Sequence, residues 1–259
     1  MPKVALLFLL VLGTTSFGQS PRSIEDRLLA HLSALEKFSN YGGTSDFEEL
    51  DKVNIKLKAD LMRFGGSAST LAYKFPRLEG KMFIATSTDG RFRVYSWDEE
   101  TGGTMHEFES VFQFKDANGR VRTWSQPPIN DYDSGGFFHD VFQVMSKSGP
   151  VYLAVSTGIA TNSLAVQGIS TFQVKGSSLN SGVKIIRTAS GLTDSISFEY
   201  DFFSVVDHAE RPIKLFKFDE AKRSFSFPVV IEDEKTPQGR VTNKLITYRF
   251  NGSYFVKAN

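Results

Sequence analysis

The sequence predicts a mainly β protein, an antiparallel meander of about a dozen strands preceded by two short helices. From residue 71 to residue 259, apolar residues tend to alternate with polar ones, the period of a strand with one face in the core. Phenylalanine is frequent, at 24 residues, which favours strands around an aromatic core. Hairpin turn signals interrupt this pattern at Asp89-Gly90, Asn118-Gly119, Ser148-Gly149 and Asn251-Gly252.

A hairpin repeat of about 30 residues organises the β region. Phe-Gln pairs recur at Phe112, Phe142 and Phe172, and phenylalanines at Phe83 and Phe202 extend the series at nearly the same spacing. Repeats of this kind indicate hairpins stacked side by side around a continuous core. We expect closure as a barrel or a sandwich. Four-stranded blades of about 60 residues would give about three, fewer than the 4–8 of most propellers.

The first part of the mature chain, residues 19–70, has helical rather than strand periodicity. Ser23–Asp26 resembles a capping box, and Ile24, Leu28, Leu32 and Leu35 follow it at helical spacing. Ser45–Glu48 forms a second box, and Gly65-Gly66 ends the helix after it. The sequence therefore predicts two amphipathic helices that plug or flank the β domain of residues 71–259.

Residues 1–18 have the three parts of a secretory signal peptide. Lys3 precedes the apolar run Val4–Leu12, and small residues follow at Ser16 and Gly18. The run is shorter than the roughly 20 residues that cross a bilayer, so we expect cleavage after Gly18 and no integral membrane span thereafter. The chain contains no cysteine, so disulfides and thiolate metal sites are excluded. An exported, disulfide-free chain is most typical of the bacterial periplasm or exterior.

The charge balance argues against a polyanionic partner. There are 30 Lys and Arg residues against 29 Asp and Glu residues, which leaves no excess charge for nucleic acid. We therefore expect the partner to be a small ligand, a glycan or an envelope protein.

Two short stretches, Gly102–Phe108 and Gly135–Phe142, each place a histidine and a carboxylate after a glycine pair. In extended strands His106 and His139 would each point away from the adjacent carboxylate, unless a bulge intervenes. We therefore interpret the likeness as turn chemistry rather than as a duplicated site. No cofactor is expected. Calcium or another metal is the alternative, and its candidate ligands are Asp131, Asp133, His139 and Asp140.

Aromatic residues near the polar loops form the candidate ligand-binding rim. Their rings stack on sugars or capture peptides when they gather on one edge, and they are Tyr95, Trp97, Trp124, Tyr132 and Phe137. The sequence thus predicts a non-enzymatic binding or structural module. The alternative is a secreted hydrolase that uses carboxylates or a metal from loops around residues 98–109 and 131–140.

Overall fold

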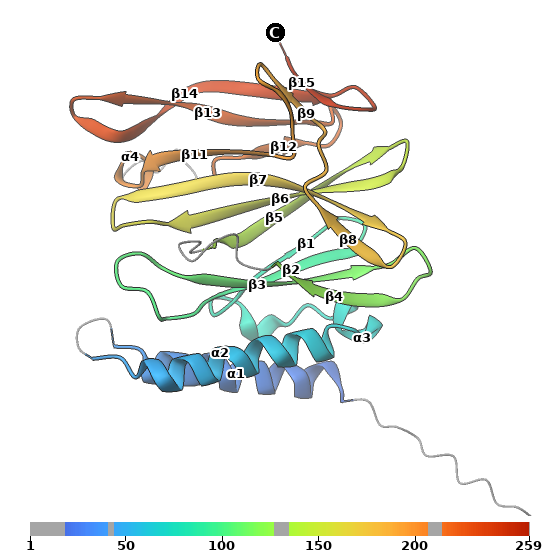
Figure 1. Cartoon of the computed structure of the whole chain (residues 1–259), viewed down its shortest axis with the longest axis vertical. Coiled ribbons are helices and arrows are strands. Elements are labelled where there is room, and N and C mark those ends of the chain that lie inside the picture. Colours follow the sequence, from blue (N-terminus) through green and yellow to red (C-terminus); the bar gives the residue numbers. More distant parts are fainter. Residues whose placement is uncertain (1–18, 41–43, 127–134, 207–213, 259) are drawn as a thin grey trace, which may run out of the picture.

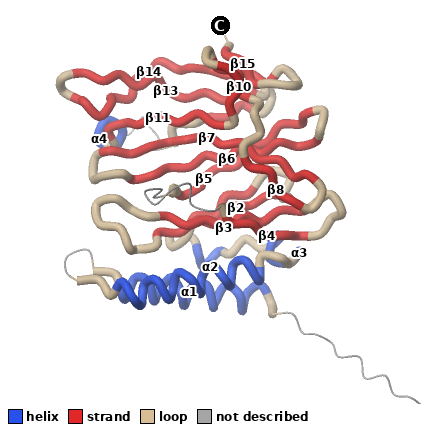
Figure 2. Tube along the Cα trace, in the orientation of Figure 1, coloured by secondary structure: helices blue, strands red, loops and turns tan. Residues whose placement is uncertain are grey.

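The protein is described from a computed structural model, which covers residues 19–40, 44–126, 135–206 and 214–258. Three open sheets stack face to face on a layer of helices, with the helices at one end of the stack (Figure 1). The prediction of a mainly β protein with N-terminal helices is confirmed, and a sandwich-like stack is the form that the sheets take. Figure 2 shows how strands fill most of the chain beyond the helical layer.

The helical layer covers one face of the first sheet. It consists of α1 (Pro21–Phe38), α2 (Phe47–Phe64), the short α3 (Ala68–Ala72) and a 3-10 turn, η1 (Pro76–Leu78). The predicted capping boxes lie close to the true starts, but the N-caps are Ser20 and Asp46, whose side chains accept from backbone N–H groups in the first turn. Leu28 and Leu57 are fully buried between the helices and the sheet.

Sheet A is a meander of four consecutive strands in the order β1-β2-β3-β4. The strands are β1 (Phe83–Thr86), β2 (Phe92–Asp98), β3 (Phe108–Lys115) and β4 (Val121–Ser125). Odd-numbered residues of β2 and β3, such as Tyr95 and Val111, pack on the helices, whereas even-numbered ones, such as Val94 and Phe112, face sheet B. Both faces of sheet A are therefore covered.

Sheet B is the middle layer, in the order β11-β7-β6-β5, with β8 paired to β7 beside that path. Its strands are β5 (Phe137–Ser146), β6 (Gly149–Ile159), β7 (Leu164–Lys175), β8 (Ser178–Ser181) and β11 (Ser195–Asp201). The short helix α4 (Phe203–Val206) follows β11. The Phe202 copy of the repeat thus lies at the end of a strand and the start of a helix, and it does not begin a hairpin.

Sheet C is the outer layer, in the order β10-β9-β15-β14-β13-β12. It comprises β9 (Ile186–Thr188), β10 (Gly191–Thr193), β12 (Lys217–Asp219), β13 (Ser224–Asp233), β14 (Thr236–Phe250) and β15 (Phe255–Lys257). All its pairs are antiparallel except that of β15 with β9. Its inner face packs on sheet B through Phe225, Phe255 and their neighbours.

The repeat places its phenylalanines in two different cores. Phe112 and Phe172 meet between sheets A and B with ring centroids 5.0 Å apart. Phe142 faces the other side of sheet B and stacks on Phe218 at 4.9 Å. Sheet A has four consecutive strands, whereas sheet B has five and sheet C has six, so the hairpin repeat of about 30 residues does not map onto one sheet in a constant way.

Candidate functional site

A cavity of about 620 Å³ lies between sheets A and B. Sheet A contributes aromatic and acidic residues to it, and sheet B contributes mostly serine, glycine and small apolar residues. The described residues around it are Glu99, Phe108, Glu109, Ser110, Phe112, Gln126, Gly135, Gly136, Phe138, Ser156, Gly158, Ile159, Ala160, Val166, Gly168, Ser170, Ser195, Ile196 and Ser197.

The cavity exists because side-chain volume falls along two paired strands of sheet B. The pairs between β6 and β7 are, in order, Tyr152–Phe172, Ala154–Ser170, Ser156–Gly168 and Gly158–Val166. Tyr152 and Phe172 are buried and fill the space beneath sheet A at one end. Ser156 and Gly168 leave that space open at the other end, where a folded core would otherwise be close-packed.

β11 continues the row of small residues across the sheet. Ser195 pairs with Ser170, and Ser197 pairs with Gly168. A Cβ on Gly168 would lie 3.4 Å from the Cβ of Ser197, an ordinary contact, so this glycine is not required by crowding from that neighbour. The hydroxyl groups of three adjacent strands therefore face one space.

On the sheet A side, β3 extends past the end of β4. β4 pairs with Val111–Lys115, so Phe108–Ser110 continue beyond it along the cavity. Gly135 has φ +65°, and a Cβ there would lie 2.2 Å from the carbonyl oxygen of Phe108. Only glycine permits this close approach, which brings the start of β5 against β3 and closes one side of the cavity.

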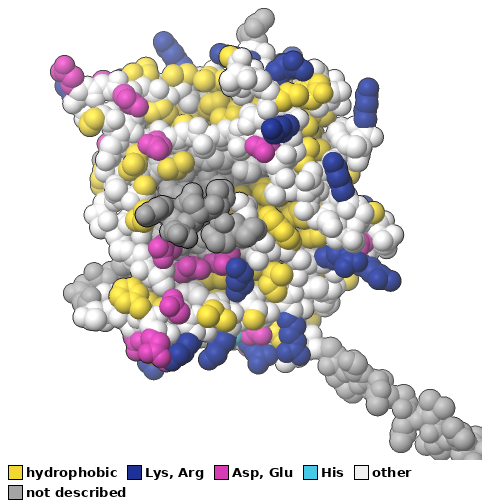
Figure 3. Space-filling view, in the orientation of Figure 1, with side chains coloured by type: hydrophobic (Ala, Val, Ile, Leu, Met, Phe, Trp, Pro, Cys, Tyr) yellow, Lys and Arg dark blue, Asp and Glu magenta, His cyan; other side chains and the backbone are white. Residues whose placement is uncertain are grey.

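Two glutamates border the cavity, but the side chain of Glu109 lies on the helix-facing side of sheet A, beside its cross-strand partner Trp97. Glu109 forms an ion pair with Lys58 of α2, with 2.5 Å between Oε2 and Nζ. Glu99 is largely buried, and burial, reinforced by the nearby negative charges of Glu109 and Glu107, raises its pKa to about 7. Figure 3 shows acidic side chains gathered on this face of the molecule.

A group of stacked aromatic rings adjoins the cavity at the ends of β1, β3 and β5. Phe83 stacks on Phe137 with centroids 3.9 Å apart, and Phe137 lies 5.1 Å from Phe108, which lines the cavity. Phe83 is 40% exposed, so part of this group faces solvent. His106 extends the group by stacking on Phe108 at 6.1 Å.

The residues predicted for an aromatic rim lie in different places. Tyr95 and Trp97 are 1% exposed and face the helices, and the indole of Trp97 donates to Asn54 Oδ1 at 2.9 Å. They are core residues and offer no ring to a ligand. Trp124 is half-buried, packs on Phe112 of the A–B core and lines a separate surface groove.

Phe137 is the predicted rim residue that lies in the aromatic group beside the cavity, and Tyr132 falls outside the described residues. The prediction for Tyr95 and Trp97 failed because their strand is covered on both faces. A polar loop after a strand does not reveal which face of that strand is already occupied.

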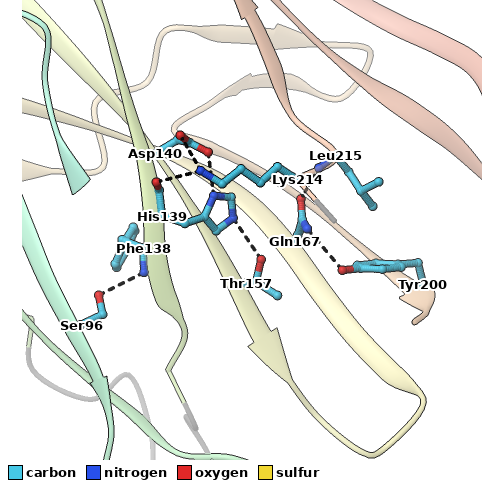
Figure 4. A network of polar contacts seen from close by, with 9 residues as sticks. All are labelled: Ser96, Phe138, His139, Asp140, Thr157, Gln167, Tyr200, Lys214 and Leu215. Carbon is cyan, nitrogen blue, oxygen red and sulfur yellow. Dashed lines mark hydrogen bonds and ion pairs between the residues drawn. The ribbon is translucent and has the colours of Figure 1, made fainter. Parts of the chain in front are cut away.

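The structure describes two of the four predicted metal ligands. Asp131 and Asp133 lie outside the described residues. His139 and Asp140 are in contact, with Nδ1 of the imidazole 2.8 Å from Oδ2 of the carboxylate (Figure 4). Within the described part of the chain, no group of three or more histidine and carboxylate side chains could hold a metal ion.

The contact between His139 and Asp140 corrects the prediction that they point apart. The register between β5 and β6 shifts between Phe138 and Asp140, so a bulge at His139 turns its side chain onto the face of its neighbour. His106 precedes β3 rather than lying within it, and its ring contacts Asp98 and stacks on Phe108.

The network around His139 joins the chain after α4 to sheet B (Figure 4). His139 Nε2 lies 3.1 Å from the hydroxyl of Thr157, and Lys214 Nζ lies 3.1 Å from Asp140 Oδ1. Although burial opposes it, the hydrogen bonds from His139 and Lys214 lower the pKa of Asp140. The backbone N–H of Leu215 donates to Gln167 Oε1 at 3.0 Å, which fastens the same segment a second time.

Sequence reasoning missed the small residues that form the cavity. The signal was present as serine and glycine at alternate positions of neighbouring strands, Ser156 and Gly158, then Gly168 and Ser170, then Ser195 and Ser197. The pattern becomes informative only when the pairing register places the three segments side by side.

In the described residues, no helix is both long and apolar enough to pass through a bilayer.

Comparisons with known proteins leave the chain without an assigned family. No family model and no curated protein matches it. Among solved structures it has a likeness to the periplasmic gluconolactonase of Pseudomonas aeruginosa, with 11% identity over 68% of this chain and 71% of that one. The TM-score is 0.17, which is too low to carry an argument about fold or function.

Proposed function

We propose that this protein is an exported binding module of the bacterial envelope or exterior, and that it takes a carbohydrate in the cavity between sheets A and B. The observation that carries the proposal is the composition of the cavity. Aromatic rings of both sheets and the hydroxyl groups of several serines line the same space. A cavity of about 620 Å³ falls within the usual size of small-ligand sites.

The two kinds of lining group match the two kinds of surface on a sugar ring. Phe108 and Phe138 are partly exposed and offer apolar faces that can stack on the C–H face of a ring. Ser156, Ser170 and the serines of β11 offer hydroxyls that both donate and accept hydrogen bonds, as sugar hydroxyls do. A wholly apolar ligand would leave these hydroxyls desolvated and unpaired, at a cost of about 1–3 kcal/mol each.

The export part of the proposal rests on the sequence. Residues 1–18 have the charge, apolar run and small residues of a secretory leader, and the chain contains no cysteine. The secreted form would then begin at Gln19, just before the N-cap of α1.

The test is titration calorimetry of the mature chain with a panel of bacterial and plant oligosaccharides, repeated with S197F. Ser197 is exposed on β11 at the cavity, so a phenyl ring there should occupy the ligand's space and weaken binding at least tenfold. The matched control is S178F, at an exposed position of β8 away from this cavity, and it should bind as the parent does. Failure of every oligosaccharide to bind, or unchanged binding by S197F, would contradict the proposal.

A further inference from the structure

One edge of sheet A is an open strand beside a surface groove. In the part of the chain that the structure describes, β4 is the last strand of sheet A and pairs with β3 alone. A groove of about 490 Å³ is lined by residues of β4 and of β8, the short strand that pairs with β7 in sheet B. No described residue lines both this groove and the cavity between sheets A and B, so the two are separate.

The hydrogen-bonding pattern of β4 directs backbone groups away from its one partner strand. At the turn before β4, the N–H of Asp116 donates to the carbonyl oxygen of Arg120 at 2.8 Å. Bonded and non-bonded positions alternate along an antiparallel pair, so Val121 and Thr123 occupy non-bonded positions opposite β3. Their N–H and C=O groups therefore point outward, and both residues line the groove. Such groups are the ones to which an added strand pairs.

Apolar side chains line part of the same groove. Trp124 and Val121 are half-buried, and Phe114 and Leu179 are buried. Trp124 packs on Phe112 with ring centroids 5.2 Å apart, which fixes the indole while leaving part of it exposed. An extended segment beside β4 can therefore pack an apolar side chain on this ring.

Positive charge gathers at the two turns beside the groove. The turn between β3 and β4 carries Lys115 and Arg120, and the turn between β7 and β8 carries Lys175. All three side chains belong to exposed residues. The turns are in contact, because the N–H of Ala117 donates to the carbonyl oxygen of Gly176 at 3.0 Å. The three charges therefore lie on one part of the surface.

These three cations have no counter-ion among the described residues. Asp116, the acid of the same turn, is fully buried, and its Oδ2 lies 2.7 Å from Nε of Arg122. It compensates Arg122 and leaves the exposed cations unpaired. Figure 3 shows lysine and arginine side chains on the side of the molecule where Figure 1 places these turns. The balanced net charge of the chain thus conceals a local excess of positive charge, which favours an anionic partner.

We infer that this groove binds an extended acidic segment of a partner protein, which adds a strand to sheet A at β4. The outward backbone groups of Val121 and Thr123 pair with the segment, Trp124 packs against it, and the exposed cations of the two turns attract its carboxylates. A flat anionic membrane would meet the cations but would not use the backbone groups in the groove. The inference goes beyond the proposed function and does not depend on it, because the carbohydrate occupies a different space.

The experiment measures fluorescence anisotropy of labelled synthetic peptides mixed with the mature chain. The acidic probe alternates valine and threonine over the length of a strand and carries a run of glutamates at one end. It is made in both orientations, and the basic probe has lysines in place of the glutamates. We expect saturable binding of the acidic probe, at least about tenfold weaker binding of the basic probe, and loss of affinity as salt is added.

Charge reversal tests the contribution of the turns. R120E/K175E should weaken binding of the acidic probe at least about tenfold, because it replaces two attractive charges with repulsive ones. K244E is the matched control. Lys244 is exposed on β14 of sheet C, away from the groove, so its reversal should leave the affinity unchanged.

T123P tests the pairing at β4. Proline lacks an N–H, and the N–H of Thr123 points away from β3, so the sheet keeps its own hydrogen bonds while the added strand loses one. Binding should weaken at least about fivefold, with circular dichroism to verify that the variant is folded. If T123P does not fold, the charge-reversal pair decides the matter. S197F, which alters the carbohydrate cavity, should bind the acidic probe as the parent does.

The outcomes separate this inference from the carbohydrate proposal. Failure of the acidic probe to bind in either orientation, or equal binding by R120E/K175E and the parent, would overturn the inference and leave the cavity untouched. Unchanged binding by folded T123P would overturn the pairing at β4. Binding to phosphatidylglycerol vesicles that is lost in R120E/K175E, without binding of either acidic probe, would assign the cations to a lipid surface instead.

Discussion

Arg93 shows how a single residue can fasten two layers. Its guanidinium is buried at 5% exposure and donates to the carbonyl oxygens of Thr70 and Tyr73 at 3.0 and 2.7 Å. Nε also donates to the hydroxyl of Thr86 at 2.7 Å. These acceptors are neutral, so the side chain acts through hydrogen bonds that join the end of α3 to sheet A.

Replacement of Arg93 should therefore destabilise the folded protein. R93M leaves two buried carbonyl oxygens without these donors, and we expect it to lower the free energy of unfolding by about 3 kcal/mol. Urea unfolding followed by circular dichroism measures the change. R91M is the control on the same hairpin, because Arg91 is exposed, and it should change stability by no more than about 0.5 kcal/mol. Equal losses in the two variants would show that the buried hydrogen bonds do not carry this stability.

Glu99 should make folding depend on pH. Folding raises its pKa from 4.5 to about 7, so between these values the folded state holds a proton that the unfolded state has released. This contribution to stability is lost as the pH rises through that window. E99Q removes the effect, so relative to the parent it should gain stability, on the order of 1–2 kcal/mol, between pH 5 and pH 8. Thermal unfolding of both proteins, measured from pH 5 to pH 8, tests this. If the parent and E99Q lose the same stability as the pH rises, Glu99 is not the group responsible.

At the scale of elements, α2 is an integral layer rather than an attachment. Leu57 is fully buried against sheet A, whereas Ile55, two residues earlier on the same helix, is 69% exposed. L57A should cost about 2–5 kcal/mol, because it removes buried methyl groups and leaves a cavity, and I55A should cost less than about 0.5 kcal/mol. Chemical denaturation of the two variants measures this contrast. A small loss in L57A would mean that the β layers are stable without the helical layer.

The two N-terminal helices could be predicted because their signals are local. Leu28, Leu50 and Leu57 recur at the period of a helix and are all buried, and Gly65 ends α2 as expected. Phe47 has the same spacing from Leu50 but is 55% exposed, because the helix begins at this residue and turns it away from the sheet. Local periodicity defines a face well in the middle of an element and poorly at its first turn.

At the scale of the whole molecule, the strands and hairpins could be predicted but the order of layers could not. The turn at Asn118-Gly119 joins β3 to β4 as its sequence indicates, since this turn chemistry is local. Which sheet faces which is decided by contacts far apart in the chain, such as Phe92 on Tyr152 with centroids 4.6 Å apart. The cavity depends on those contacts, so the sequence alone could not show that its serines and glycines line one space. The bulge at His139 depends on how β5 pairs with β6, which the sequence also does not show. It reversed the prediction made from strand parity.

The central claim is that the space between sheets A and B is a binding site for a carbohydrate. The most direct measurement is titration of the isotope-labelled mature chain with the oligosaccharide panel, with backbone amide shifts followed by NMR. If a carbohydrate binds there, the shifts should be saturable and concentrated in the segments 108–112, 156–160, 166–170 and 195–197, which contain the cavity-lining residues. Shifts confined to the surface groove beside Trp124, or none with any oligosaccharide, would contradict it.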